Sequence, residues 1–380
     1  MKVALIHYWL VNMRGGEKVL EALCRMFPHA DIFTHVYDPA AVSDVIRAHS
    51  VKTTLISRLP FARQRYQNYL PLMPLALEEL DLSGYDLIIS SEAGPAKGVT
   101  PPPDAAHLCY VHSPMRYIWD QYHVYKRHAG FAARTAMPLL AHQLRIWDAI
   151  SAVRVDAFVA NSAHVAKRVN KFYRREAAVV HPPVAVDDFA PAPRGERENF
   201  YLWAGELVAY KRPDIAIEAF NRLGRQLVVI GGGEMRGKLE KTAKGNIKFL
   251  GRTDFETLKR CMARCKALVF PGEEDFGIIP VEAMASGRPV IAYGRGGALD
   301  TIIDGETGLL FDDQSVEGLM AAIESFEASD LANADPAPFV ARARLFDEAA
   351  FRRGIFTALL RLGVADPSIA APLGDHRAIA

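Results

Sequence analysis

The sequence predicts an α/β protein built from two doubly wound units, each with a parallel sheet that is covered by helices on both faces. Short apolar runs alternate with helical patterns along almost the whole chain. Within these runs apolar and polar residues do not alternate, which is typical of strands buried on both faces of a parallel sheet. A chain of 380 residues is also too long for one ordinary core, so two units are expected.

The apolar runs predict eleven strands, five in the first half of the chain and six in the second. The first five cover residues 2–8, 31–36, 86–91, 106–113 and 157–162, and the other six cover 199–205, 226–233, 247–251, 267–272, 289–294 and 308–311. Helical periodicity lies between them, most clearly over residues 16–27, 212–223, 257–265 and 281–287. Repeats of strand, helix and strand predict parallel pairing within each half.

The regular pattern breaks at His181–Asn199, a stretch rich in proline and charge that we interpret as a linker. We therefore expect an N-terminal Rossmann-like domain over residues 1–185 and a C-terminal one over 196–345. The helical stretch of about 346–364 should cross back to the first domain, and the residues after it should be frayed. Ligands of doubly wound folds bind outside the carboxyl ends of the strands, which predicts a site in the cleft between the domains.

The composition argues against several classes of protein. About 23% of the residues are charged and the formal net charge is +1, so a nucleic-acid partner is not expected. The chain opens on an apolar strand without a secretory leader, and no apolar run approaches the roughly 20 residues of a membrane span. Cys261 and Cys265 lack a second Cys or His pair, which favours buried thiols over a zinc site. A cytoplasmic protein is the expectation.

The loops after the predicted strands of the second half carry glycines and cations. Lys211 and Arg212 follow the first of these strands, three glycines at 231–233 follow the second, and Gly296 and Gly297 follow the strand at 289–294. Glycine-bearing turns and two cations around one cleft suit a diphosphate. The glycines at 231–233 also resemble a dinucleotide-binding turn, so an NAD-dependent oxidoreductase is an alternative. Arg236 stands where that motif has its third glycine.

Two acids, Glu274 and Glu282, lie eight residues apart around a predicted turn from strand to helix. They could merely complement the helix dipole. They could instead accept hydrogen bonds from vicinal hydroxyls, Glu282 from a ribose and Glu274 from a sugar, on either side of a diphosphate. The sequence contains no Asp-x-Asp motif, so no metal ion and no other cofactor are expected. Lys211, Arg212 and helix N-termini would then balance the phosphate charge.

These residues resemble glycosyltransferase family 4, the large retaining group with the GT-B fold. The family's Glu-x7-Glu signature is met by Glu274 and Glu282, within a run from Pro271 to Phe311 that is similar to the family's most typical region. The resemblance implies transfer of a hexose from a nucleotide diphosphate sugar. It also implies a donor site made of Lys211, Arg212, Glu274, Phe276, Gly277, Ile278 and Glu282.

The first half of the chain resembles the same family. Gly15 and Gly16 in "RGGEKVLEAL" match its N-terminal glycine loop, which implies contact with the donor phosphates or the acceptor, although a plain tight turn is an alternative. The stretch "YVHSPMRYIWD", Tyr110–Asp120, is similar to a motif of bacterial polysaccharide mannosyltransferases. By this resemblance His112 faces the transferred sugar, and the catalytic residues are His112, Lys211 and Glu274.

The mannosyltransferase motif makes GDP-mannose the preferred donor, for lipopolysaccharide O-antigen or another surface polysaccharide. UDP-sugars and GDP-linked deoxy sugars are alternatives. One residue departs from the family pattern, because Glu206 stands where the family usually has Arg, five residues before the phosphate-binding Lys211. This departure leaves a catalytically inactive GT-B partner subunit as a further alternative.

Two stretches of the first half, Lys52–Leu80 and Tyr122–Trp147, mix basic residues with apolar and aromatic ones. Such a mixture suits contact with anionic lipid head groups, and it suits amphipathic helices packed on the sheet equally well. Peripheral association with the inner face of the plasma membrane is therefore a hypothesis for the domain that recognises the acceptor.

Overall fold

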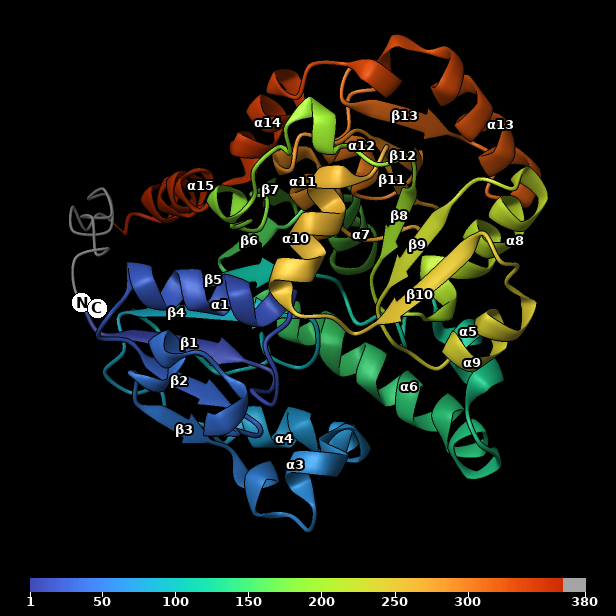
Figure 1. Cartoon of the computed structure of the whole chain (residues 1–380). Coiled ribbons are helices and arrows are strands. Elements are labelled where there is room, and N and C mark those ends of the chain that lie inside the picture. The colour runs from blue at the N-terminus through green and yellow to red at the C-terminus, as the bar shows by residue number, and fades with distance from the viewer. Residues whose placement is uncertain (365–380) are drawn as a thin grey trace. The chain divides into compact units, whose positions relative to one another are not determined.

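The computed structural model describes residues 1–364, which divide into two compact units, shown in Figure 1. The N-terminal unit comprises Met1–Pro183 together with the described residues from 349 to 364, and the C-terminal unit comprises Val184–Glu348. The fraying predicted after Val364 lies outside the described residues. Among those described, none of the helices combines the length and apolar composition that a membrane span requires.

The N-terminal unit is a seven-stranded parallel sheet in the order β3-β2-β1-β4-β5-β6-β7. Its strands are β1 Val3–His7, β2 Asp31–Thr34, β3 Val51–Thr53, β4 Leu87–Glu92, β5 Ala106–Val111, β6 Ala157–Ala160 and β7 Ala177–Val179. Its helices are α1 Gly15–Met26, α2 Asp44–Arg47, α3 Ala62–Arg65, α4 Met73–Glu78, α5 Tyr122–His128, α6 Phe131–Ser151, α7 Ala163–Tyr173 and α15 Glu348–Arg361.

Both faces of this sheet are buried, as the continuous apolar runs predict. In β1, Val3 and Leu5 pack in one core with α1 and α15, while Ala4 and Ile6 pack in a second core on the opposite face. The last helix, α15, thus completes the first unit, since its Phe351 and Ile355 are buried against the N-terminal sheet.

The C-terminal unit is a six-stranded parallel sheet in the order β10-β9-β8-β11-β12-β13. Its strands are β8 Tyr201–Ala204, β9 Leu227–Ile230, β10 Ile247–Gly251, β11 Leu268–Phe270, β12 Val290–Tyr293 and β13 Gly308–Phe311. Its helices are α8 Pro213–Leu223, α9 Arg236–Thr242, α10 Phe255–Arg264, α11 Ile278–Ala285, α12 Ala298–Thr301, α13 Val316–Ala328 and α14 Ala337–Ala343.

The predicted fold class is confirmed, and the differences from the predicted elements have local causes. The unpredicted strands β3 and β7 are edge strands of three residues with half-exposed or exposed side chains; β3 forms no apolar run, and the apolar run of β7 is short. The stretch interpreted as a linker is not free, because Val184, Val186 and Phe189 are buried in the C-terminal core. Apolar side chains among the prolines of this stretch anchor it to the second unit.

The strand order places one switch point in each sheet, where the chain changes its direction of progress across the sheet. It lies between β1 and β4 in the first unit and between β8 and β11 in the second. Loops that follow the two central strands diverge there and leave a crevice at their carboxyl ends, which is where doubly wound folds bind ligands. The loops after β8 and β11 carry Lys211 and Glu274.

Candidate functional site

Lys211 and Glu274 meet at the switch point of the C-terminal sheet. Lys211 ends a short 3₁₀ turn, Ala209–Lys211, after β8, and Glu274 lies in the loop between β11 and α11. The Nζ atom of Lys211 donates a hydrogen bond to Oε1 of Glu274 at 2.6 Å, and the two side chains are 15% and 18% exposed. The pair is therefore partly accessible to a ligand from solvent.

The charge on Lys211 is stabilised by its surroundings. Burial favours the neutral amine, but attraction to Glu274, Tyr210 and Glu206 outweighs burial and raises the pKa of Lys211. The lysine is therefore a cation at neutral pH, placed directly before the N-terminus of α8. A cation is unfavourable beside the positive end of a helix dipole. An anion bound at this place would be stabilised both by Lys211 and by the N-terminus of α8.

Glu206 and Arg212, the two residues that the sequence analysis considered beside Lys211, have different surroundings. Glu206 lies close enough to contribute to the raised pKa of Lys211, so it adds negative charge to this site. The guanidinium of Arg212 is instead held by Asp214, with distances of 3.1 Å from Nε to Oδ1 and 3.0 Å from Nη2 to Oδ2. Arg212 itself has a left-handed backbone, with φ of 51°. Its assignment to the donor site stays a prediction.

Glu282 lies on the second turn of α11, which begins three residues earlier than predicted, at Ile278. The loop acid Glu274 and the helix acid Glu282 are thus separated by the start of the helix. Gly277 caps this helix with φ of +83°, a backbone that favours glycine. Phe276 is 3% exposed and packs against Phe346, so only its backbone is available to a donor.

Glycines hold these loops against one another. A Cβ atom at Gly272 would lie 2.7 Å from the Cα of Lys211, and one at Gly297 would overlap the backbone of Phe276. The N–H of Gly297 donates to the carbonyl of Glu274 at 2.9 Å. These glycines therefore position the segments that carry Lys211 and Glu274. The contact of Gly297 with a diphosphate, which the sequence analysis suggested, stays a prediction.

The glycines at 231–233 are likewise occupied by the chain itself. A Cβ at Gly231 would overlap the carbonyl oxygen of Gly205, and one at Gly233 would lie 2.5 Å from the carbonyl oxygen of Leu207. Because this turn packs against the loop after β8, it does not present the open backbone of a dinucleotide fingerprint. Arg236, at the third glycine position, begins α9 and pairs with Glu240. Nothing in this geometry favours the oxidoreductase alternative.

In the N-terminal unit, His112 follows β5 directly. Its backbone N–H donates to the carbonyl of Glu92 at 2.8 Å, and a hydrogen bond of 2.8 Å joins its Nε2 to Oγ of Ser91. Asn161 donates from Nδ2 to the carbonyl of His112 at 3.0 Å. The half-buried imidazole is thereby fixed at the carboxyl edge of the sheet.

Gly15 and Gly16 begin α1, after the loop that follows β1. Neither has a positive φ, and a Cβ at Gly16 would overlap the hydroxyl of Tyr8, so packing accounts for this glycine. Beside it Glu17 is 2% exposed and accepts the N–H of Arg14 at 2.9 Å. Burial opposes the charged form of Glu17, but interactions with His7, whose Nε2 lies 3.9 Å from Oε1, and with backbone N–H groups together outweigh burial and lower the pKa of Glu17.

A buried charged network beneath His112 was missed by the sequence analysis. Lys97 pairs with Glu92 at 3.4 Å and with Asp148, and all three side chains are 0% exposed. Trp119 donates from Nε1 to Oδ2 of Asp148 at 2.7 Å, which ties the "HSPMRYIWD" segment to α6. The detectable signal was a Glu at the end of β4 and a Lys five residues later, in "SSEAGPAK", behind the apolar residues that begin the strand.

Burial and charge act against each other inside this network. Burial raises the pKa of Glu92, against the attraction of Lys97. Burial alone would lower the pKa of Lys97, but Asp148 and Glu92 outweigh it and the pKa is raised. With no exposed atom in the three side chains, the network supports the loops around His112 and does not itself offer a ligand site.

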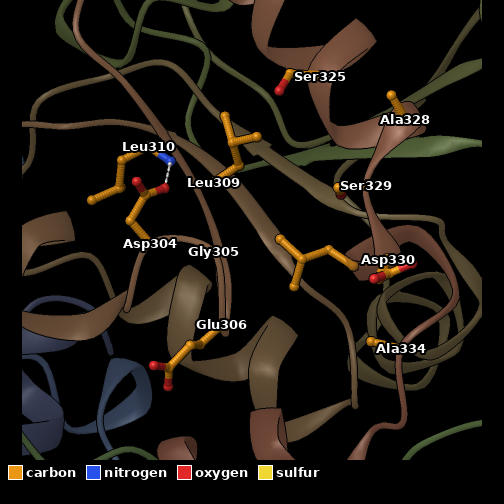
Figure 2. Close-up of a pocket in the computed structure, with 11 residues that line it drawn as sticks. Asp304, Gly305, Glu306, Leu309, Leu310, Ser325, Ala328, Ser329, Asp330 and Ala334 are labelled. Carbon is orange, nitrogen blue, oxygen red and sulfur yellow. Dashed lines mark hydrogen bonds between the residues drawn. The ribbon is translucent and has the colours of Figure 1, made fainter.

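A separate pocket of about 770 Å³ lies beside β13 in the C-terminal unit, and Figure 2 shows the residues that line it. Its charged lining residues are the acids Asp304, Glu306 and Asp330, and Asp304 accepts the N–H of Leu310 at 2.8 Å. None of the predicted donor-site residues lines this pocket. Within residues 1–364, no group of three or more His, Cys, Asp or Glu is arranged to hold a metal ion.

Two family models match the chain, one for each unit. Residues 13–188 match Glycosyltransferase Family 4, and residues 186–344 match Glycosyl transferases group 1. The second match contains Lys211, Glu274 and Glu282, and the first contains His112 with Gly15 and Gly16. The candidate residues of each unit thus lie in a matched region.

Curated relatives align with part of the chain. An uncharacterized glycosyltransferase of Methanocaldococcus jannaschii is 36% identical over 130 residues, which are 33% of this chain and 37% of that protein. A D-inositol 3-phosphate glycosyltransferase of Mycobacterium sp. strain KMS is 30% identical over 168 residues, which are 39% of this chain and 38% of that protein. The chain therefore aligns with less than half the length of these relatives.

Among solved structures, HepE of Anabaena in complex with UDP has a TM-score of 0.70 at 16% identity, over 95% of this chain and 100% of that one. WaaG, a glycosyltransferase involved in lipopolysaccharide biosynthesis, has a TM-score of 0.65 at 16% identity, over 94% and 99%. At this identity the likeness shows the fold alone.

Proposed function

Because the chain belongs to the family 4 glycosyltransferases with the GT-B fold, we propose that it transfers a hexose from a nucleotide diphosphate sugar. The acceptor is a saccharide or a lipid-linked saccharide of a surface polysaccharide. In this proposal the C-terminal unit binds the donor and the N-terminal unit recognises the acceptor. The main support for this proposal is the Lys211–Glu274 pair at the switch point, where a cation that can bind a phosphate meets a carboxylate that can accept hydrogen bonds from sugar hydroxyls.

A diphosphate at this site would compete with Glu274 for Lys211. The Nζ atom of Lys211 now donates to Glu274 at 2.6 Å, and a phosphate oxygen would replace that carboxylate as acceptor. Glu274 would then be released to accept hydrogen bonds from the hydroxyls of the sugar. Glu282, one turn into α11, would hold the ribose hydroxyls.

The proposed reaction retains the anomeric configuration through displacement on the front face of the sugar. The bond from the anomeric carbon to the phosphate oxygen breaks, the acceptor oxygen bonds to that carbon, and the departing phosphate takes the acceptor's proton. Lys211 stabilises the negative charge that develops on the leaving diphosphate, so the contribution is electrostatic and independent of a metal ion. His112 is the residue of the N-terminal unit proposed to face the transferred sugar.

The proposed donor is GDP-mannose, and its support is the likeness of "HSPMRYIWD" to mannosyl-transferring relatives. The alternative donor is a UDP-sugar, because the structural neighbour HepE is known in complex with UDP and with UDP-glucose. A GDP-linked deoxy sugar is a second alternative. Binding of nucleotides distinguishes these donors directly.

The N-terminal unit is proposed to associate with an anionic membrane from the cytoplasmic side. The predicted stretches expose large apolar side chains, among them Phe61 at 70%, Phe131 at 81% and Leu139 at 65%. Arg63 and Arg65 are exposed on α3 next to Phe61. Apolar side chains flanked by cations suit an anionic interface. Co-sedimentation with anionic liposomes tests this; a protein that stays in the supernatant would contradict it.

The donor proposal is tested by thermal shift with GDP, UDP, ADP, dTDP and NAD, each with its sugar conjugates where they exist. A ligand at 100 times its Kd stabilises the folded protein by about 2.7 kcal/mol, which is an easily measured rise in Tm. Glu282→Ala should raise the Kd of the bare nucleotide by at least about tenfold, because it removes a hydrogen-bonded carboxylate. Glu274→Ala should chiefly weaken binding of the sugar part of the donor and reduce turnover, and it should not weaken binding of the bare nucleotide, because Glu274 competes with the diphosphate for Lys211.

A matched control is Glu240→Ala, which removes an exposed acid of α9 that pairs with Arg236. Equal nucleotide affinity in Glu282→Ala and wild type would reject the ribose assignment. A response to NAD alone would reject the glycosyltransferase proposal. A protein that responds to no nucleotide would favour the inactive partner subunit, which the acid Glu206 beside Lys211 supports.

A further inference from the structure

Three arginines lie at the amino-terminal edge of the C-terminal sheet, opposite the edge that carries Lys211. Arg194 and Arg197 precede β8, and Arg288 stands two residues before β12. In a parallel sheet the amino ends of all strands lie at one edge, so these arginines are remote from the carboxyl ends of β8 and β11. The proposed donor site does not use them.

Arg288 is almost completely enclosed. Its side chain is 2% exposed, and the acceptors found for it among the described residues are two backbone carbonyls. Its Nε donates to the carbonyl of Gly287 at 2.7 Å, and its Nη1 donates to that of Cys265 at 3.4 Å. No carboxylate within the described part of the chain forms an ion pair with it.

Arg197 points inward because its neighbours point outward. Its backbone is extended, with φ of −69° and ψ of 134°, so adjacent side chains lie on opposite sides. Glu196 and Glu198 both pair with Arg264, at 2.6 Å and 3.5 Å. The Nε and Nη2 atoms of Arg197 are buried and find no hydrogen-bond partner within residues 1–364.

The electrostatics of this cluster are unfavourable for the protein alone. Burial lowers the pKa of Arg288 to about 10, and repulsion from Arg197 adds to the effect. Burial also lowers the pKa of Arg197, with a contribution from Arg194 that Asp335 opposes. Asp335 accepts the N–H of Ala337 at 2.7 Å and forms an ion pair with none of the three arginines in the described structure. Buried donors and like charges of this kind cost free energy unless an anion compensates them.

We propose that Arg197 and Arg288, with Arg194 at the rim, bind a small oxyanion such as inorganic phosphate or sulfate. Planar guanidinium groups match the geometry of an oxyanion and bind it through two parallel hydrogen bonds. The bound anion joins the segment before β8 to the end of α11, the helix that carries Glu282. Proline side chains of Pro191 and Pro336 pack beside Gly287 and enclose the same region.

The test measures the Tm of the full chain as potassium phosphate replaces potassium chloride at constant ionic strength. Each variant is made in wild type and in Lys211→Met, which removes the other candidate phosphate-binding cation. We expect a saturable rise of about 3 °C in both backgrounds. Arg197→Met should abolish the rise, or increase the apparent Kd for phosphate at least about tenfold. Arg222→Met is the matched control, because its guanidinium is exposed and paired with Glu218 and Glu317.

The proposal also predicts that phosphate reverses the order of stability of Arg197→Met and the wild type. A simple folding defect in the variant would not produce such a reversal. Without phosphate the variant should be as stable as the wild type or more stable, because a like charge has been removed next to Arg288. With saturating phosphate the wild type should be the more stable protein. The proposal is overturned if phosphate and chloride give equal Tm values in the wild type, or if Arg197→Met keeps the full response.

Discussion

Lys97 and Lys211 make the same kind of contact in the two units, and their surroundings differ. Each lysine follows a central strand of its sheet, β4 or β8, and each pairs with a carboxylate at the carboxyl edge. Lys97 and its two acids are 0% exposed, whereas Lys211 and Glu274 are 15% and 18% exposed. Lys97 also has the ring of Tyr173 at 4.6 Å.

The comparison shows that burial separates a structural ion pair from one that can exchange partners. Water cannot reach a fully buried ion pair, so removal of one member leaves the charge of the other uncompensated. A partly exposed pair can give up one member to a ligand, because solvent and the ligand both offer replacement hydrogen bonds. We therefore interpret Lys97 as a residue that stabilises the fold and Lys211 as a residue of the proposed donor site.

The largest expected effect is on stability, from Lys97→Met. This change leaves Glu92 and Asp148 buried without their cation, which costs about 3–5 kcal/mol in the free energy of unfolding. In thermal unfolding the N-terminal unit should melt roughly 10 °C lower. The control is Lys167→Met on α7, an exposed lysine whose loss should cost less than about 0.5 kcal/mol. Equal Tm values for the two variants would contradict the comparison.

The second effect is on turnover, from Lys211→Met. Removal of the cation proposed to stabilise the leaving diphosphate should lower kcat by about 10²–10³-fold. Its Tm should fall by less than half the fall in Lys97→Met, since Glu274 keeps access to water. Arg212→Met is the matched control: Asp214 already holds its guanidinium, so kcat should fall less than about tenfold. An equal loss in both variants would support the prediction that Arg212 is a diphosphate ligand.

The smallest expected effect separates the two units by their response to acid. Burial lowers the pKa of His35 and of His107 to about 4, from 6.5 in the unfolded chain. The unfolded chain binds more protons between these values, so the stability of the N-terminal unit is full above pH 6.5 and is lost as the pH falls toward 4.

The C-terminal unit should respond at lower pH. Hydrogen bonds, first of all from Arg225, lower the pKa of Glu327 to about 2, so its stabilisation is lost only as the pH falls below 4.5. Tryptophan fluorescence follows the units separately, because Trp203 lies in the second unit and the other tryptophans lie in the first. His107→Gln should flatten the pH dependence of the first unit between pH 6.5 and 4. An unchanged slope would show that His107 is not the titrating group.

Local pattern was sufficient for the fold class and for most strands. A strand such as Leu227–Ile230 is visible in the sequence because its residues are consecutive and apolar, and the sheet's two covered faces require that pattern. The Glu274–Glu282 region was visible for the same reason, since its turn and helix are contiguous in the chain. The edge strand Val51–Thr53 was missed because only one side of it is covered, so its residues need not be apolar.

The partners of the charged residues were decided by the tertiary structure alone. Lys211 and Glu274 are 63 residues apart, and they meet because β8 and β11 are neighbours in the strand order, which no local pattern encodes. The same reason applies to Lys97 with Asp148, which lies 51 residues away on α6. Sequence patterns record whether a residue is buried, but the energy of a buried charge depends on what surrounds it in space. The sequence therefore determined where the loops of the site begin, and the packing of the sheet determined which of their charges are balanced.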